Sequence, residues 1–507
     1  MNTERTRFAL RRIPLQTAAL GCFLLFSWSL AAQEPAAGAS RPAKAGSALK
    51  STSAVSALLV SDLHFEPFWD PGKVPQLATE PVRQWDAVLS APPSPDQAAR
   101  FAALQETCHA RGADTSYSLL HSSLGAMRER ARNAKFVTVS GDLIAHAFSC
   151  KFSTVFPQAK PGDYRAFVQK TLDYVAGELR NSIPGVPVYV ALGNNDSDCG
   201  DYRLDPHSDF LASEGRAVTG DFPAGERNEA LKTFAEGGYY SVSLPAPLRR
   251  ARLIVLEDVF MSRKYETCGG KPDASAADAE IAWLRQQLAH ARQEKEVVWV
   301  MGHIPPGVDP YSTAAKLRNV CGGQKPEMFL SSGTLPETLA EYGDVVRLGI
   351  FAHTHMDEMR LLKPEADSAS AAAPPGVPIK LVPSISPIDG NNPSFTVASI
   401  DPSTAILKDY RVFAASDSSG VGTSWAEEYD YAQSFHEASF SAPDVASMMA
   451  GFETDRSGST EPSQSYMRSY FVRDISLEIK AFWPQYVCAF THWTAESFRT
   501  CTCSNAP

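Results

Sequence analysis

Short apolar runs alternate with segments of helical periodicity along most of this chain. Six of the runs predict buried strands: SALLVSD (56–62), KFVTVSGD (135–142), VPVYVALGN (186–194), RLIVLED (252–258), EVVWVMGH (296–303) and VRLGIFAH (346–353). Between them, apolar residues recur with a helical period in segments that begin at Tyr117, Tyr164 and Asp278. Continuous apolar strands that alternate with helices predict an α/β fold whose sheets are covered on both faces.

The pattern changes toward both ends of the chain. A basic stretch and then an apolar run from Cys22 to Ala32 are typical of an export signal. The next twenty residues are rich in alanine, serine, glycine and proline, which predicts a flexible leader. Near the C-terminus, SMMAGFETD, QSYMRSYFV and LEIKAFWPQYVCAF predict helices. We therefore expect a signal peptide at 1–33, a leader at 34–53, a large α/β domain at 54–410 and a helical region at 411–507.

The apolar run near the N-terminus is too short to predict a membrane-spanning helix. We therefore expect an exported protein, periplasmic or secreted, with no transmembrane segment in the mature chain. Lipid attachment at Cys22 and a twin-arginine signal at Arg11 and Arg12 stay open as alternatives. Removal of residues 1–33 leaves 43 basic and 56 acidic side chains, a formal charge of −13. This charge argues against specific binding of duplex nucleic acid or of anionic membranes.

Cysteine usage points to the same compartment. Once Cys22 is removed with the signal, an even number of cysteines remains, which indicates disulfides in an exported chain. They are Cys108, Cys150, Cys199, Cys268, Cys321, Cys488, Cys501 and Cys503. None of them forms the C-x-x-C pattern of a zinc site. Eight cysteines allow about 105 connectivities, so their spacing alone leaves the pairing open.

Five of the apolar runs end in residues that suit metal binding. They deliver Asp62 and His64, then Asp142 and His146, then Asn194 with Asn195 and Asp196, then His303, and finally His353 and His355. Ligand sites in α/β sheets lie beyond the carboxyl ends of the strands, so we expect these residues to meet. Side chains two apart on a strand point to the same side, so His353 and His355 are expected to face one site.

Seven of these side chains form a candidate ligand set of four imidazoles, two carboxylates and one amide: His64, His303, His353, His355, Asp62, Asp142 and Asn194. A single tetrahedral metal needs about four ligands, whereas seven with one shared carboxylate fit two ions. Two ions about 3.5–4 Å apart hold both the attacking and the leaving oxygen of a phosphoryl displacement. Nitrogen and oxygen ligands without thiolate favour zinc, with manganese and iron as alternatives.

The order of these motifs resembles that of the calcineurin-like metallophosphoesterases, and more closely their acid sphingomyelinase-like phosphodiesterase branch. SGDLIAH, MGHIPPG, AHTHMDEM and GNNPSF are each similar to a motif of that branch. The resemblance covers nearly all of the chain after the leader. It implies a four-layer αββα sandwich of two mixed sheets as the catalytic domain, followed by a small helical, disulfide-containing region.

The resemblance also implies roles for the matching residues. One ion would be held by Asp62, His64, Asp142 and His355, and the second by Asp142, Asn194, His303 and His353. His146 would protonate the leaving alkoxide or stabilise the phosphate oxygens, the alternative being a structural histidine. By motif position, disulfides are expected between Cys150 and Cys199 and between Cys268 and Cys321.

Two positions depart from the family pattern. Asn195 stands where a histidine usually contacts phosphate and transfers a proton, and an amide donates hydrogen bonds without transferring a proton. We expect Asn195 to serve as a catalytic and substrate-binding group of this limited kind, and the acid role to pass to His146 or water. Ala352 stands where glycine is usual, which the intact ligands indicate is tolerated. Asn391 and Asn392 are expected to border the substrate.

The function expected from this sequence is phosphodiester hydrolysis by in-line attack of water at a site with two metal ions, on a nucleotide or a phospholipid or sphingomyelin-type headgroup. G-N-N-D also resembles endopolyphosphatases, so hydrolysis of polyphosphate or nucleoside triphosphates is the alternative. That reaction favours a basic track, for which LRRAR (248–252) is the one obvious cluster. A catalytically silent phosphate-binding protein is the third possibility, because Asn195 replaces a reactive residue.

Overall fold

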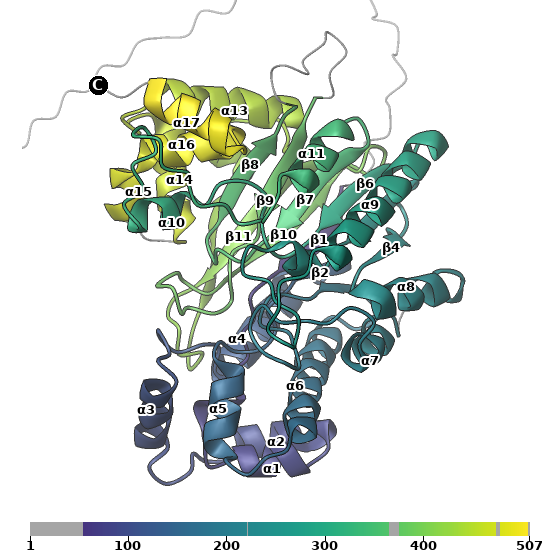
Figure 1. Ribbon diagram of the computed structural model, residues 1–507, viewed down its shortest axis with the longest axis vertical. Helices are drawn as coiled ribbons and strands as arrows, with labels where there is room; N and C mark the ends of the chain where they lie inside the picture. Colours follow the sequence, from purple (N-terminus) through teal and green to yellow (C-terminus); the bar gives the residue numbers. More distant parts are fainter. Residues whose placement is uncertain (1–53, 221, 365–374, 473–476, 505–507) are drawn as a thin grey trace, which may run out of the picture. The chain divides into compact units, whose positions relative to one another are not determined.

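Two six-stranded mixed sheets form the centre of the computed structural model, which describes residues 54–220, 222–364, 375–472 and 477–504 (Figure 1). The first sheet has the order β12 (Trp425–Asp430), β11 (Leu407–Ala415), β10 (Ser394–Ile400), β1 (Val55–Val60), β2 (Ala134–Ser140) and β3 (Val188–Ala191). The second has the order β4 (Tyr240–Ser243), β5 (Ala251–Val255), β6 (Val297–Met301), β7 (Val346–Phe351), β9 (Val377–Leu381) and β8 (Glu358–Leu362). The expected signal peptide and leader lie outside the described residues.

The strands that matter for the site run parallel to one another. In the first sheet β1, β2 and β3 are parallel neighbours, and in the second β5, β6 and β7 are. The carboxyl ends of parallel neighbours meet at one edge of a sheet, so residues that follow these strands are brought together. In the first sheet the antiparallel strands β10, β11 and β12 follow β1 on the side away from β2. In the second sheet the antiparallel pairs form both edges, β4 with β5 and β8 with β9.

Side chains between the sheets form the core. Phe136 of β2 packs its ring edge-on against Trp299 of β6, with centroids 5.8 Å apart. The hydroxyl of Tyr240 on β4 donates to the carbonyl of Val190 on β3 at 3.1 Å. Strands buried on both faces require apolar residues at consecutive positions, which explains why the predicted runs lack alternation. Contacts of this kind fix one sheet against the other.

Helices cover the outer faces of both sheets, and the predicted four-layer αββα arrangement is confirmed. Among those that contact the sheets, α4 lies on β10, α7 on β3, α9 on β6 and α11 on β8. The helices before residue 410 are α1 (Val74–Thr79), α2 (Trp85–Ser90), α3 (Gln97–Thr107), α4 (Tyr117–Arg130), α5 (Phe148–Val155), α6 (Pro161–Ser182), α7 (Asp209–Val218), α8 (Ala224–Gly237), α9 (Ser275–Glu294), α10 (Pro310–Ala315) and α11 (Thr334–Glu341). Short 3-10 helices are η1 (Pro67–Trp69), η2 (Val82–Gln84) and η3 (Asp258–Met261).

The C-terminal region begins as sheet and ends as helices. Strand β11 passes through residue 410 and β12 follows it in the first sheet, so the predicted helices begin only at Tyr431. They are α12 (Tyr431–Phe435), α13 (Ala442–Thr454), α14 (Glu461–Tyr470), α15 (Leu477–Ala481), α16 (Trp483–Thr491) and α17 (Ala495–Ser504). Helices α13 and α16 pack against β8 (Figure 1). None of the helices in the described ranges is long and apolar enough to cross a membrane.

Four disulfides join the cysteines as Cys108–Cys150, Cys199–Cys268, Cys321–Cys503 and Cys488–Cys501. The expected pairs Cys150–Cys199 and Cys268–Cys321 are therefore wrong. The pairing depends on which elements pack together in the fold. Helix α3 lies beside α5 and brings Cys108 to Cys150. The loop after α10 meets the C-terminal helices and brings Cys321 to Cys503. The Cα atoms of each bonded pair lie 5.5–5.8 Å apart, within the usual range for a disulfide.

Candidate metal centre and substrate cavity

The seven candidate ligands all follow parallel strands and meet between the two sheets. Those from the first sheet follow β1, β2 and β3, and they are Asp62, His64, Asp142 and Asn194. Those from the second sheet follow β6 and β7, and they are His303, His353 and His355. Three overlapping groups among the described residues place ligand atoms within 4.8 Å of one another: Asp62, His64 and Asp142; Asp142, His303 and His353; and His64, His146 and His355.

The backbone is strained where the ligands lie. Positive φ angles occur at Asp62 (46°), His64 (41°), Asp142 (56°), His353 (71°) and His355 (65°). Residues other than glycine rarely adopt this left-handed conformation, and when they do they tend to cluster at active sites and ligand sites. All five left-handed residues lie just after the ends of β1, β2 and β7.

The histidine pair at the end of β7 reaches the site in a different way from that expected. Strand β7 ends at Phe351, so His353 and His355 are not strand residues, and the argument from strand alternation does not apply to them. His353 Nδ1 lies 3.2 Å from His303 Nε2, whereas His355 Nε2 lies 3.1 Å from His64 Nε2. The two rings therefore face different neighbours across the site.

Asp142 lies between the two groups of histidines. Its Oδ2 is 3.4 Å from His64 Nε2 on one side and 3.3 Å from His303 Nε2 on the other. Asp62 Oδ1 lies 3.7 Å from His64 Nε2 and 3.5 Å from His355 Nε2. One carboxylate oxygen thus faces both groups, the arrangement that two neighbouring cations require.

The hydrogen bonds around the site leave lone pairs converging on two points. His64 Nδ1 donates to the carbonyl of Ile144 at 2.9 Å, and His303 Nδ1 donates to that of Ser140 at 2.8 Å. In a neutral imidazole the other nitrogen then carries a lone pair. The Nε2 atoms of both rings point at acceptor atoms, which include Asp142 Oδ2 and, for His303, Asn194 Oδ1 at 3.1 Å. Such atoms repel one another unless a cation lies among them.

Two further observations fit bound cations. Asn194 Nδ2 donates to Asp201 Oδ1 at 2.7 Å, which fixes the amide so that its oxygen faces His303. Both carboxylate oxygens of Asp62 are buried without a hydrogen-bond partner among the described residues. Unpaired buried carboxylate oxygens are costly, and metal ligands of this kind are normally oriented by partners such as Asp201. The donor set and its surroundings therefore fit divalent ions.

The electrostatics of the site also favour positive charge. Burial lowers the pKa of His64, but the neighbouring Asp142 carboxylate outweighs it and raises the pKa to about 9. The same balance raises the pKa of His303 to about 10. Burial alone would raise the pKa of Asp142, yet the adjacent histidines hold it well below its ordinary value. The carboxylates of the site therefore favour a positive charge beside them.

Two buried carboxylates behind the ligands hold the loops in place. Asp196 accepts backbone N–H groups of Leu143 at 2.8 Å and of Gly193 at 3.0 Å. Asp258 accepts the N–H of His303 at 2.9 Å. Burial raises the pKa of each carboxyl to about 7. Sequence reasoning assigned neither role, although Asp258 ends a predicted strand as the ligands do.

His146 lies against the ligands and is held by a carboxylate that sequence reasoning missed. Its ring stacks on that of His64, with centroids 4.0 Å apart. Asp114 accepts the backbone N–H of His146 at 2.9 Å and its Nδ1–H at 3.0 Å. Ser386 donates to the same carboxylate at 2.8 Å. Asp114 lies in a loop before α4, and no strand or motif precedes it that would have drawn attention to it.

The asparagines predicted to meet the substrate have other partners. Asn195 is buried, and its backbone N–H and its Nδ2 donate to the two oxygens of Asp142, each at 2.8 Å. Asn392 Nδ2 donates to the carbonyl of Val472 at 2.6 Å, and Asn391 Nδ2 to that of Ser386 at 3.0 Å. None of the three asparagines is among the residues that line the cavity. Contact with substrate stays a prediction for them.

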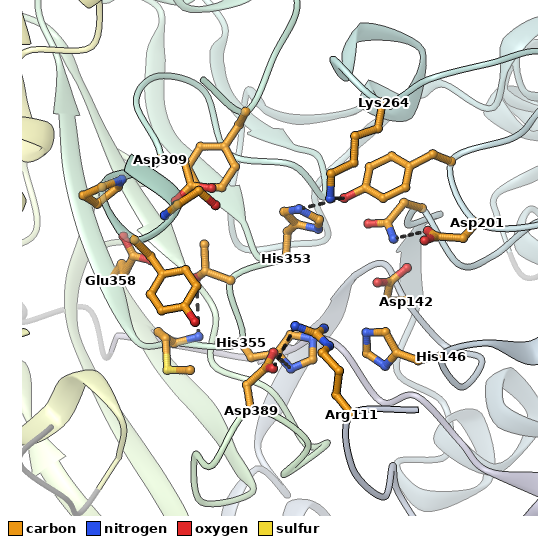
Figure 2. Close-up of a pocket in the computed structure, with 18 of the residues that line it drawn as sticks. Arg111, Asp142, His146, Asp201, Lys264, Asp309, His353, His355, Glu358 and Asp389 are labelled. Atoms are coloured by element: carbon orange, nitrogen blue, oxygen red, sulfur yellow. Dashed lines mark hydrogen bonds and ion pairs between the residues drawn. The ribbon is translucent and has the colours of Figure 1, made fainter. Parts of the chain in front are cut away.

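A cavity of about 310 Å³ opens onto the ligands (Figure 2). Asp142, His146, Asn194, His353 and His355 lie in its wall, so both ligand groups are accessible from it. The remaining wall mixes charged and aromatic side chains: Arg111, Asp201, Tyr202, Lys264, Asp309, Pro310, Tyr311, Ser312, Phe329, Thr354, Met356, Glu358, Asp389, Tyr470 and Phe471. Residues from the first sheet, the second sheet and the C-terminal region thus enclose one space.

A family model described as calcineurin-like phosphoesterase matches residues 56–357, and the chain belongs to this family. The family implies bound divalent metal ions, which the donor set fits. The sequence-based prediction of a metal-dependent phosphoric ester hydrolase of the sphingomyelinase-like branch is confirmed.

Three relatives illustrate the similarity to this branch. The chain is 25% identical over 463 residues to "Acid sphingomyelinase-like phosphodiesterase 3b" of Mus musculus, covering 87% of this chain and 88% of the relative. It is 24% identical to "Sphingomyelinase phosphodiesterase C" of Dictyostelium discoideum, covering 59% and 62%. It is 22% identical to "Cyclic GMP-AMP phosphodiesterase SMPDL3A" of Mus musculus, covering 76% and 81%.

Proposed function

We propose that this chain is an exported phosphodiesterase with two bound divalent ions. The observation that carries the proposal is the position of Asp142, one oxygen of which lies 3.3–3.4 Å from a ring nitrogen of each ligand group. A carboxylate in this position could be shared by two ions, and two neighbouring ions suit in-line displacement at phosphorus.

The ligands divide into two sets that share Asp142. Asp62, His64, Asp142 and His355 would hold one ion, and Asp142, Asn194, His303 and His353 the other. Nitrogen and oxygen donors without thiolate favour zinc, and manganese or iron would also fit. When bound, the ions supply Lewis acidity that activates water and neutralises charge on the phosphoryl oxygens.

The chain's own residues orient the substrate and handle the proton. In the hydrolysis, water adds to phosphorus and the bond from phosphorus to one ester oxygen breaks. His146 lines the cavity, and Asp114 holds its Nδ1–H, so Nε2 is the nitrogen left to donate to the departing oxygen. Asn195 would act on the reaction through Asp142, because its backbone N–H and one N–H of its side-chain amide are donated to that carboxylate.

The substrate proposed is a small phosphodiester, either a nucleotide or a phospholipid or sphingomyelin-type headgroup. The relatives are named for sphingomyelin and for cyclic GMP-AMP, and both compounds contain a phosphodiester. The cavity volume suits a headgroup or a nucleotide. Aromatic side chains in its wall, such as Tyr311 and Phe471, offer surfaces for a base or an aliphatic group.

Export is proposed from the four disulfides together with the basic and apolar pattern of residues 1–33. Disulfides persist in oxidising compartments and are rare in the cytosol. The phosphoanhydride alternative gains nothing from LRRAR, because no residue of 248–252 lines the cavity.

The test compares a chromogenic phosphodiester with its matching phosphomonoester. The protein is stripped of metal with a chelator, reloaded with zinc or manganese, and assayed with bis-p-nitrophenyl phosphate and p-nitrophenyl phosphate. We expect metal-dependent hydrolysis with a higher kcat/KM for the diester, followed by a panel of nucleotides, sphingomyelin and polyphosphate. Preference for the monoester would make the protein a phosphatase, and two bound ions without hydrolysis of any substrate would favour a silent binding protein.

A further inference from the structure

A tyrosine and a lysine from two distant loops meet beside His353 in the wall of the cavity. The Tyr202 hydroxyl lies 3.2 Å from His353 Nε2, and Lys264 Nζ donates to the same hydroxyl at 3.2 Å (Figure 2). The ammonium also lies 4.6 Å from the centre of the Tyr202 ring. Both residues line the cavity, and neither is a candidate metal ligand.

The two loops are fastened to each other at several points. Glu266 N–H donates to the carbonyl of Tyr202 at 3.1 Å, and Leu204 N–H donates to that of Glu266 at 3.3 Å. Arg203 and Glu266 form an ion pair at 2.9 Å. Tyr202 itself has a φ angle of 56°, in the region that residues other than glycine rarely occupy.

A disulfide adds a covalent link to the same pair of loops. Cys199 lies three residues before Tyr202, Cys268 lies four after Lys264, and the two cysteines are bonded. A strained backbone that is held this firmly is typical of residues positioned for a function.

When an ion is bound at His353, the hydrogen-bond pattern leaves the O–H of Tyr202 unused. His353 Nδ1 faces His303 Nε2, so Nδ1 offers its lone pair when an ion is bound there, and Nε2 carries the proton. Nε2 then donates to the Tyr202 oxygen, which also accepts from Lys264. Both acceptor positions of the hydroxyl are filled. Its own O–H has no acceptor in the described part of the chain.

Lys264 has donors to spare as well. An ammonium has three N–H groups, and the one hydrogen bond recorded for Lys264 Nζ among the described residues goes to Tyr202. Lys264 makes no ion pair with a described carboxylate, whereas Arg111, the other cation of the wall, lies 3.3 Å from Asp389. Two N–H groups of Lys264 are therefore open to an anion in the cavity, although the carboxylate of Asp201 also lies near this charge.

We propose that Tyr202 and Lys264 together bind the phosphoryl oxygens of the substrate, the tyrosine through its O–H and the lysine through its ammonium. The proposal rests on the proposed function. It also accounts for Asn195: that residue faces Asp142 and is absent from the cavity wall, so the donor that a histidine would supply comes from the Tyr202 side instead.

The test measures binding of inorganic phosphate to the zinc-loaded full chain by calorimetry, with zinc content determined for every variant. Tyr202→Phe and Lys264→Met each remove the proposed donor. Tyr265→Phe and Lys271→Met are matched controls from the same segment: Tyr265 donates to the Leu204 carbonyl at 2.9 Å, Lys271 is exposed, and neither lines the cavity.

We expect each of the two variants to weaken phosphate binding about tenfold or more with zinc content unchanged, because hydrogen bonds to charged groups are strong. The controls stay within twofold of the wild type. Equal affinity in both variants, loss of zinc from Tyr202→Phe, or no phosphate binding by the zinc-loaded wild type would each overturn the proposal. Lys264→Met decides the matter if Tyr202→Phe does not fold. A wild type that binds phosphate but hydrolyses no ester would refute the proposed function and leave this comparison valid.

Discussion

Asp114 and His146 are joined twice, because the carboxylate accepts both the backbone N–H of the histidine at 2.9 Å and its Nδ1–H at 3.0 Å. The pair is completed by Ser386 and lies beside the stacked ring of His64. Burial alone would raise the pKa of Asp114, but His146 holds it well below its ordinary value, so the carboxylate stays ionised. A histidine fixed in this way presents the same nitrogen to the cavity at every turnover.

Removal of His146 is expected to matter most for substrates with poor leaving groups. A proton donor assists an alkoxide, which is strongly basic, but is hardly needed by p-nitrophenolate. His146→Ala should lower kcat for an alkyl or nucleoside ester about 10²-fold or more, and that for bis-p-nitrophenyl phosphate much less. Asp114→Asn should show the same selectivity in a milder form. Equal losses on both substrates would instead mean that His146 serves the structure of the site.

Asp142→Asn is expected to remove more metal than Asp62→Asn. Asp142 faces both ligand groups, whereas Asp62 lies near His64 and His355 alone. Metal analysis after dialysis should find two ions per wild-type chain, close to none for Asp142→Asn and about one for Asp62→Asn. Retention of both ions by Asp142→Asn would contradict the shared position of this carboxylate.

Asn195→Ala distinguishes a role in contacting substrate from a role in positioning Asp142. The structure places the Asn195 amide on Asp142 Oδ2, so its loss should weaken zinc binding about 10- to 100-fold. With zinc in excess, KM for a diester should change little. The reverse outcome, a raised KM with unchanged zinc affinity, would support the substrate contact predicted from the sequence.

The disulfides should differ in how much they stabilise the chain. Cys321–Cys503 spans 182 residues and Cys488–Cys501 spans 13. A longer closed loop restricts the unfolded chain more, so Cys503→Ser is expected to lower the free energy of unfolding by about 2 kcal/mol more than Cys501→Ser. Denaturant unfolding under oxidising conditions measures both. Equal losses would show that local packing, rather than loop length, decides the effect.

Stability should fall as pH rises, because of two buried carboxyls. Glu280 Oε1 accepts the N–H of Glu257 at 2.7 Å, and burial raises the pKa of both side chains well above 4.5. The folded chain therefore keeps protons that the unfolded chain loses above pH 4.5. The contribution of these two carboxyls to stability is full below that pH and declines above it, by up to about 1.4 kcal/mol per pH unit for each carboxyl.

Glu280→Gln is the variant that tests this, since its amide oxygen keeps the hydrogen bond without a proton to lose. Unfolding in denaturant at pH 5, 6.5 and 8 should give a shallower decline than the wild type. Glu294→Gln, at an exposed position of the same helix, is the control. Identical slopes for Glu280→Gln and wild type would show that Glu280 does not titrate as described.

Part of this site could be predicted from the sequence because its candidate ligands closely follow their strands. Asp62, Asp142 and His303 each come two residues after a buried strand, so apolar pattern and residue type suffice to predict that they meet. His353 likewise comes two residues after β7 and reaches the site, but the argument from strand alternation failed for His353 and His355, because β7 ends at Phe351 and both residues are left-handed. A pattern of apolar residues does not encode that turn.

Other parts depend on contacts between segments that are distant in the sequence. Asp114 reaches His146, and Lys264 reaches Tyr202, only after loops from different parts of the chain have packed. The prediction of the disulfide pairs failed for the same reason, since the order of motifs in the sequence does not tell which segment lies beside α5 or α17. The sheet beyond residue 410 was missed because β12 carries polar residues such as Glu427 and Asp430, which mask a strand.

Each of the two ligand groups takes residues from both sheets, so metal can bind only after the two sheets have packed together. Before the sheets have packed, no part of the chain holds more than a fraction of either group, so the unfolded polypeptide does not offer a complete set of ligands to either ion. Loading follows folding, and the compartment in which folding finishes supplies the metal. Because affinities follow a similar order at most sites of this type, the supply there, more than the donor set, selects between zinc, manganese and iron.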